Sequence, residues 1–173
     1  MSNIKTPRLV LRPFTMKDAP RLCELIAEPE IISMMEQPPW PYTLADAELW
    51  LRGLPSRKER KQAYCFAIEI PRTGIIGGIS LQKKNSDLFD LGFWVGKDYW
   101  GKGYANEAAQ AIMAWGVNEL ALTKITVGYF QDNPASGKLL QKLGFVATGK
   151  ACPINNPLRD KPVACLGMIW TAQ

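Results

Sequence analysis

Apolar and polar residues follow two different periods along this chain, and the period of two marks the strands. Residues 8–14 (RLVLRPF) alternate apolar and charged positions, which predicts a half-buried strand. Apolar runs at 63–70 and 75–83, separated by PRTG, predict two strands joined by a hairpin turn. The other predicted strands cover residues 87–96, 124–130, 145–151 and 163–170.

Helical periodicity and capping residues predict the remaining elements. Thr15 and Thr43 each precede an aspartate by three residues, which is the pattern of a capping box at a helix start. The predicted helices cover residues 15–27, a short segment after Pro29, 43–60, 105–122, and the segment from DNPAS to 142.

The resulting order, β-α-α-β-β-β-α-β-α-β-β, predicts an α+β fold with a mixed, mostly antiparallel central sheet flanked by helices. One β-α-β crossover is expected around the helix 105–122. Because the chain shows no repeat, linker or low-complexity tract, we expect one domain over residues 1–173.

The composition is that of an ordinary globular protein, with 47% hydrophobic and 21% charged residues. No signal-peptide pattern or membrane-length apolar stretch is present, so we expect a cytoplasmic protein with no membrane partner. The formal charge of +5 favours anionic partners. The basic run RKERK at residues 57–61 suits a helix end better than a nucleic-acid surface, so no nucleic-acid partner is expected.

Two residue types narrow the chemistry. Histidine is absent, which excludes histidine acid–base, nucleophilic and zinc sites. The four cysteines are scattered without a CxxC pair, so we expect reduced, mostly buried thiols and no metal. Proton transfer must therefore use carboxylates, tyrosine, serine, cysteine, lysine or water.

The stretch YWGKGYANEA connects a predicted strand to a predicted helix with few side chains. Gly101 and Gly103 allow positive φ and close backbone approach, and Lys102 adds a charge. The unpaired N–H groups of a helix N-terminus suit a phosphate or pyrophosphate. Glycines also serve tight turns with no ligand, so this segment alone leaves both interpretations open.

The chain resembles the GNAT superfamily of acyl-CoA-dependent N-acetyltransferases, and within it the RimJ/RimL type that acetylates ribosomal-protein N-termini. The resemblance covers nearly the whole chain and rests on TPRLVLRPF, IIGGISL, LGFWVGKDYWGKGYANEA and DNPASGKLLQKLGF. The family pattern Gln/Arg-x-x-Gly-x-Gly/Ala falls on Trp100, Gly101, Lys102, Gly103, Tyr104 and Ala105, with Trp100 departing from the first position. The resemblance implies a GNAT fold and acetyl-CoA as co-substrate, its pyrophosphate bound by the backbone of this loop.

The resemblance also implies a role for the strand before the loop. In the family this strand splays from the next one, and its backbone pairs with the pantetheine arm. The implied positions are about Phe93 to Val95, with Trp94 and Val95 as cofactor-binding residues and an N–H near Val95 as oxyanion donor. Gly92 and Gly96 are consistent with a bulge, a close backbone approach or simple strand punctuation.

Two carboxylates are candidate general bases. Asp90 matches the strand position at which several GNAT enzymes carry a glutamate that acts as general base. Glu69 is the second candidate. A solvent-facing charge is the alternative for Asp90. Glu107, in the first turn of a helix, is explained by the helix dipole.

For the departing thiolate, many relatives use a tyrosine seven residues after the motif asparagine, but that position is Leu140 here. The resemblance offers Ser136 as donor to the sulfur and Asn133 as a pantetheine-binding residue. Both residues suit helix capping equally well.

The resemblance implies direct acetyl transfer to a primary amine, with a protein N-terminal α-amine as the leading acceptor. Acetylation of a small amine, such as a polyamine, aminoglycoside or amino-acid derivative, is one alternative, and CoA binding or sensing without turnover is another. Trp40 and Tyr42 fall in the segment that walls the acceptor pocket in the family, or pack over the second helix. The sequence leaves the oligomeric state open, including a homodimer.

Overall fold

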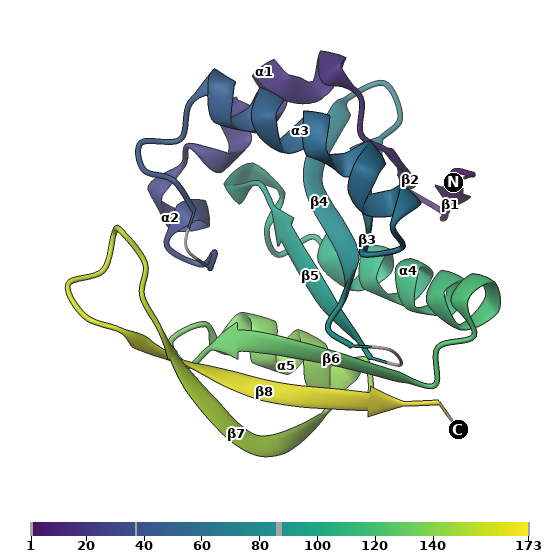
Figure 1. The fold of residues 1–173 in the computed structure, drawn as a ribbon, viewed down its shortest axis with the longest axis vertical. Coiled ribbons are helices and arrows are strands. Elements are labelled where there is room, and N and C mark those ends of the chain that lie inside the picture. The colour runs from purple at the N-terminus through teal and green to yellow at the C-terminus, as the bar shows by residue number, and fades with distance from the viewer. Residues whose placement is uncertain (1, 37, 86–87, 173) are drawn as a thin grey trace.

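The computed structural model describes residues 2–36, 38–85 and 88–172. Within them lies an eight-stranded sheet with the order β1-β2-β3-β4-β5-β6-β8-β7 (Figure 1). The strands are β1 (Ile4–Lys5), β2 (Val10–Pro13), β3 (Ala63–Ile70), β4 (Gly74–Lys83), β5 (Phe89–Val95), β6 (Lys124–Phe130), β7 (Val146–Ile154) and β8 (Val163–Thr171). The helices are α1 (Ala19–Ile26), α2 (Pro29–Ile32), α3 (Leu44–Glu59), α4 (Tyr104–Leu120) and α5 (Pro134–Lys142).

The predicted element order is confirmed, with small shifts at the boundaries. The sequence did not predict β1, because two residues are too few to show a periodic pattern. The predicted helix 15–27 is divided into a 3-10 turn (Met16–Asp18) and α1. Asp87, at the start of one predicted strand, lies outside the described residues.

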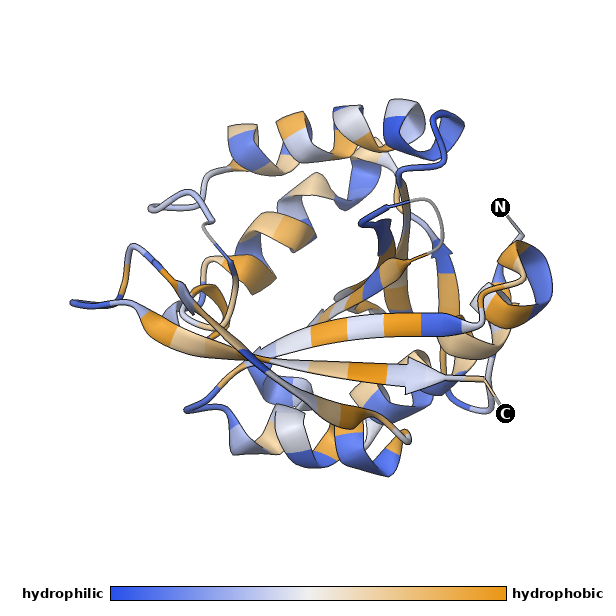
Figure 2. Cartoon of the chain, turned by 60° about the horizontal axis from the view of Figure 1, so that its bottom comes forward, coloured by the Kyte–Doolittle hydropathy of each residue, from blue (hydrophilic) through white to orange (hydrophobic). Residues whose placement is uncertain are grey.

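The described strand pairs are antiparallel except β5 with β6, which are parallel and joined through α4. This confirms the predicted α+β fold with a mixed, mostly antiparallel sheet. Figure 1 shows α1, α2 and α3 gathered on one side of the sheet, with α4 crossing behind β3, β4 and β5. Figure 2 shows hydrophobic and more polar positions alternating along β6.

Strand β5 separates two hydrophobic clusters through the alternation of its side chains. Leu91, Phe93 and Val95 join the cluster under α4, whereas Trp94 packs against the residues of α1 and α3. The alternation of side chains along a strand thus places these residues on two opposite faces of the sheet.

The two edges of β5 differ sharply. Its register with β4 is uninterrupted from the Lys83–Phe89 pair to the Gly77–Val95 pair, so the bulge considered at Gly92 is not present. Within the described chain, β6 pairs with β5 only through Ile125 and Thr126, opposite Phe89 and Asp90. Beyond these pairs the two strands diverge (Figure 1), and we call the stretch over which their backbones are not paired the β5–β6 gap.

Candidate active site

The loop between β5 and α4 contains the two glycines predicted to bind an anion. Gly101 has a φ of 72° and Gly103 a φ of 79°, in the region where an L side chain is strained. Gly103 is also the N-cap of α4 and offers no side chain to the first N–H groups of the helix. Among the described residues no side chain caps the first N–H groups of α4, those of Tyr104 and Ala105, and such N–H groups suit an anion.

Two cations flank this loop. The Lys102 Nζ donates to the Asp98 carbonyl at 2.9 Å. The Arg8 guanidinium donates to the Lys102 carbonyl at 2.9 Å and lies 4.7 Å from the centre of the Tyr104 ring. A Cβ placed on Gly103 would lie 3.4 Å from the Arg8 Nη2. Sequence reasoning missed Arg8, because its alternating segment indicates only a strand and the fold alone brings it to α4.

Glu107 fastens the N-terminal segment to the first turn of α4. Its carboxylate accepts hydrogen bonds from the Thr6 hydroxyl at 2.6 Å, the Arg8 backbone N–H at 2.9 Å and the Arg8 Nε at 2.6 Å. Burial raises the pKa of Glu107, but these hydrogen bonds outweigh it and hold the pKa below its ordinary value. Glu107 thus has a structural role wider than the helix-dipole interaction expected from the sequence.

The backbone of β5 presents alternate residues to the β5–β6 gap. The Gly96 N–H donates to the Ile76 carbonyl at 2.8 Å, so Gly96 and, two residues earlier, Trp94 direct their backbone groups toward β4. Phe93 and Val95 consequently direct theirs toward the gap. The geometry therefore favours Phe93 and Val95 over Trp94 for backbone pairing with a ligand.

Trp100 hydrogen-bonds to one of the backbone groups that face the β5–β6 gap. Its indole Nε1 donates to the Val95 carbonyl at 2.6 Å, while 47% of the residue stays exposed. Val95 lies beyond the last β5–β6 pair. Its N–H, by contrast with its carbonyl, has no hydrogen-bond partner among the described residues. Trp100, which departs from the first position of the family pattern, thus contacts the β5–β6 gap directly.

The two candidate bases lie in different places, and both are engaged. Asp90 lies at the vertex of the gap, where it accepts a hydrogen bond from the Thr126 hydroxyl at 2.7 Å and pairs with the Lys84 Nζ at 2.9 Å. Glu69 lies on β3, with β4 between it and β5, and forms an ion pair with Arg12. The structure therefore brings Asp90, but not Glu69, to the gap.

The start of α5 lies beyond the end of β6. Asn133 caps the helix, its Oδ1 accepting from the Ser136 N–H at 3.1 Å. The half-buried Ser136 hydroxyl has no hydrogen-bond partner among the described residues. Leu140 is fully buried in the cluster under α4, which agrees with its failure to match the family tyrosine.

The loop between β7 and β8 bridges the two halves of the molecule. The buried Asn156 amide donates to the carbonyls of Ile32 at 2.7 Å and Met35 at 2.9 Å, and the Arg159 Nε donates to the Ser33 carbonyl at 2.9 Å. No motif or periodic pattern predicted this bridge. The expected acceptor wall is divided: Trp40 is 42% exposed, whereas the partly buried Tyr42 packs against the α1–α3 cluster.

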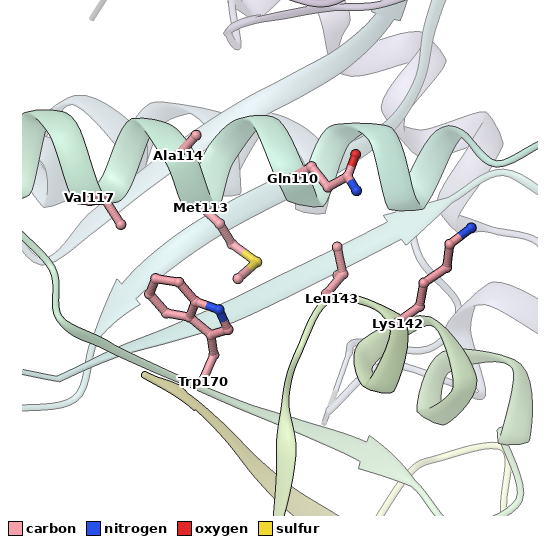
Figure 3. Close-up of a pocket in the computed structure, with 7 residues that line it drawn as sticks. All are labelled: Gln110, Met113, Ala114, Val117, Lys142, Leu143 and Trp170. Carbon is pink, nitrogen blue, oxygen red and sulfur yellow. The ribbon is translucent and has the colours of Figure 1, made fainter. Parts of the chain in front are cut away.

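A hollow of about 300 Å³ lies elsewhere, between α4, the end of α5 and β8 (Figure 3). Figure 3 shows Met113, Leu143 and Trp170 converging on it, with Lys142 at its edge. Trp170 pairs with Ile125, at the closed end of the β5–β6 gap. The hollow is therefore separate from the glycine loop and from the open part of the gap.

The cysteines partly contradict the sequence prediction. All four are free thiols, but only Cys65 is buried, and Cys152 is exposed. Burial raises the pKa of both Cys65 and Cys165 to about 11, which makes these two thiols poor nucleophiles. In the part of the chain that the structure describes, no helix could cross a membrane, and no three cysteine, aspartate or glutamate residues cluster as metal ligands do.

Comparison with known proteins agrees with this geometry. Residues 8–146 match the Acetyltransferase (GNAT) domain family. The uncharacterized N-acetyltransferase p20 of Bacillus licheniformis is 30% identical over 152 residues, covering 86% of this chain and 85% of its own.

Two solved structures share the fold at low sequence identity. The ribosomal-protein-S5-alanine acetyltransferase of Vibrio fischeri has a TM-score of 0.85 at 18% identity, covering 99% of this chain and 97% of its own. The microcin C7 self immunity acetyltransferase MccE, in complex with acetyl-CoA and AMP, has a TM-score of 0.83 at 18% identity, covering 96% and 94%. With its sequence relatives and fold in agreement, the chain belongs to the GNAT family of acetyltransferases.

Proposed function

We propose that this protein transfers the acetyl group of acetyl-CoA directly to a protein N-terminal α-amine. One observation carries the proposal: the glycine loop at the start of α4 directly follows the strand whose backbone faces the β5–β6 gap. The diphosphate of the coenzyme would lie at the loop N–H groups, with Lys102 and Arg8 beside it. The pantetheine arm would then extend along Phe93 and Val95 toward the vertex of the gap.

The Val95 N–H is the proposed donor to the oxyanion that forms on the thioester carbonyl. A backbone N–H that is already fixed needs no reorganisation during the reaction, and such a donor contributes about 3 kcal/mol in a dry site. The crystal structure of MccE, which shares the fold, contains bound acetyl-CoA. A cytoplasmic setting is part of the proposal, because four free thiols fit a reducing compartment.

The engaged carboxylates favour an α-amine as acceptor. Asp90 is paired with Lys84, and Glu69 with Arg12, so neither is an unencumbered base. An α-amine with a pKa of about 8 is about one-tenth neutral at pH 7, whereas a lysine amine is neutral in only a few molecules per ten thousand. The α-amine therefore needs the least help, and Asp90 suffices to accept a proton through water.

A panel of acceptors tests the proposal. Purified protein and acetyl-CoA are incubated with ribosomal-protein N-terminal peptides, their N-terminally blocked counterparts and small amines, and products are read by mass spectrometry. We expect acetylation at the α-amine of unblocked peptides. Acetylation of small amines alone would replace the acceptor, and CoA binding without any product would indicate a binding module.

A further inference from the structure

Breaking a thioester leaves a thiolate, and a hydrogen-bond donor beside the sulfur accelerates that step. This inference rests on the proposed function and concerns a residue that the motifs do not single out. The donor must lie on the part of the gap where the backbone of Phe93 and Val95 is exposed.

Tyr129 on β6 occupies that level of the gap. The parallel pairs Phe89–Ile125 and Asp90–Thr126 fix the offset between the strands, and the same offset brings Tyr129 level with Phe93. Both side chains belong to the face of the sheet covered by α4 and α5. Tyr129 is half-buried there, unlike the fully enclosed Val127 two residues earlier.

A glycine in α5 makes room for this ring. A Cβ placed on Gly137 would lie 2.7 Å from the Tyr129 Cε2, 2.9 Å from the Cζ and 3.1 Å from the hydroxyl oxygen. Glycine in a helix interior costs about 1 kcal/mol relative to alanine, so its presence here has a compensating reason. The ring rests against the first turns of α5 and holds the hydroxyl close to the helix N-terminus.

No hydrogen bond engages this hydroxyl among the described residues, although it lies at the junction of β6 and α5. We infer that the Tyr129 hydroxyl protonates the coenzyme A sulfur as the carbon–sulfur bond breaks. The amine nitrogen forms the new bond to the acetyl carbon, and the electron pair of the broken bond goes to sulfur. The sulfur takes the Tyr129 proton, the nitrogen releases one proton through water to Asp90 and from there to solvent, and the phenolate regains one from solvent.

The kinetic test compares Tyr129→Phe with Ser136→Ala and with the control Tyr64→Phe, which changes a buried phenol on β3. Tyr129→Phe keeps the ring contact with Gly137, so we expect kcat to fall about 100-fold with an unchanged Kd for CoA. Tyr64→Phe is expected to keep kcat within about threefold of the parent, and Ser136→Ala is expected to lower kcat less than Tyr129→Phe does, since neither removes the proposed donor. A large loss in Ser136→Ala with none in Tyr129→Phe would overturn the inference.

A proximity test needs no turnover. Tyr129→Cys is incubated with the symmetric disulfide of CoA, so that its thiolate displaces one CoA and forms a mixed disulfide with the other. We expect one more CoA adduct by mass spectrometry than in the parent protein, suppressed by excess acetyl-CoA. If the adduct forms while no amine is acetylated, the proposed function fails but Tyr129 still lies beside the sulfur. Absence of the adduct in a variant that binds CoA with the parent's Kd would refute this placement.

Discussion

The two strands beside β5 differ in how far they pair with it. Strand β4 pairs with it along its whole length, whereas β6 pairs through Phe89 and Asp90 and then departs. Buried backbone groups without partners are costly, so an unpaired strand edge in the interior calls for a polar partner. The β4 edge of β5 is therefore a structural contact, and the β6 edge is the binding surface in the proposed function.

The glycines on the two sides serve these two purposes. On the β4 side, Gly77 permits close packing, because a Cβ there would lie 2.3 Å from the Trp94 carbonyl oxygen. On the loop side, Gly101 and Gly103 have open space or only an arginine nearby, and what they supply is positive φ. Substitutions should accordingly separate folding from binding.

The largest effect is expected on the binding side. Gly103→Glu strains the backbone at φ 79° and places a carboxylate where the diphosphate would lie, so we expect the Kd for CoA to rise at least about 100-fold by calorimetry. Gly74→Glu is the matched control, since Gly74 has a φ of 101° in the β3–β4 hairpin. If both variants lose the same amount of CoA affinity, backbone strain and not the anion site is responsible for the loss.

The next largest effect is expected on the structural side. Gly77→Ala forces β4 away from β5, so we expect the free energy of unfolding to fall by about 1–3 kcal/mol in urea titrations. Gly53→Ala in α3, where a Cβ meets only the Arg57 side chain at 3.9 Å, should instead raise it by up to about 1 kcal/mol. A Gly77→Ala protein of unchanged stability would contradict the tight β4–β5 contact.

A smaller effect is expected from Trp100→Phe. The substitution keeps an aromatic ring but removes the indole donor to the Val95 carbonyl, worth about 1 kcal/mol. We expect the Kd for CoA to rise about fivefold and the free energy of unfolding to fall by no more than about 1 kcal/mol. A large loss of stability with no change in Kd would make Trp100 part of the fold and not of the gap.

The smallest effect concerns pH. The pKa of Glu107 is lower in the folded protein than its ordinary value, so its stabilisation is complete above that ordinary value and is lost as pH falls through the folded pKa. Glu107→Gln should therefore be less stable than the parent at pH 7, and the difference should shrink as the pH is lowered below about 4.3. A difference that stays constant down to pH 3 would show that the charge is not involved.

Regular patterns made most of the fold predictable. Capping pairs such as Thr43 with Asp46 and the apolar runs of β3 and β4 depend on neighbours in sequence, and these elements form where predicted. The glycine loop was predictable for a similar reason, because glycine is the residue type that adopts a positive φ without strain. The short β1 was not, because its pairing depends on β2 alone.

The parts of the site that the sequence did not predict all depend on long-range contacts. Arg8 reaches the glycine loop across 94 residues, and Asn156 reaches Ile32 across 124. The buried position of Leu140 and the engagement of Asp90 by Lys84 are likewise products of packing. A motif identifies which residue types are present, but only the fold shows which of them are already committed.

Amide hydrogen exchange at Val95, with and without CoA, tests the central assignment most directly. The Val95 N–H faces the gap and should become at least about tenfold better protected when CoA binds, whereas the Trp94 N–H, which faces β4, should not change. Unchanged exchange at Val95 in a protein saturated with CoA would contradict the assignment of this strand edge as the binding surface.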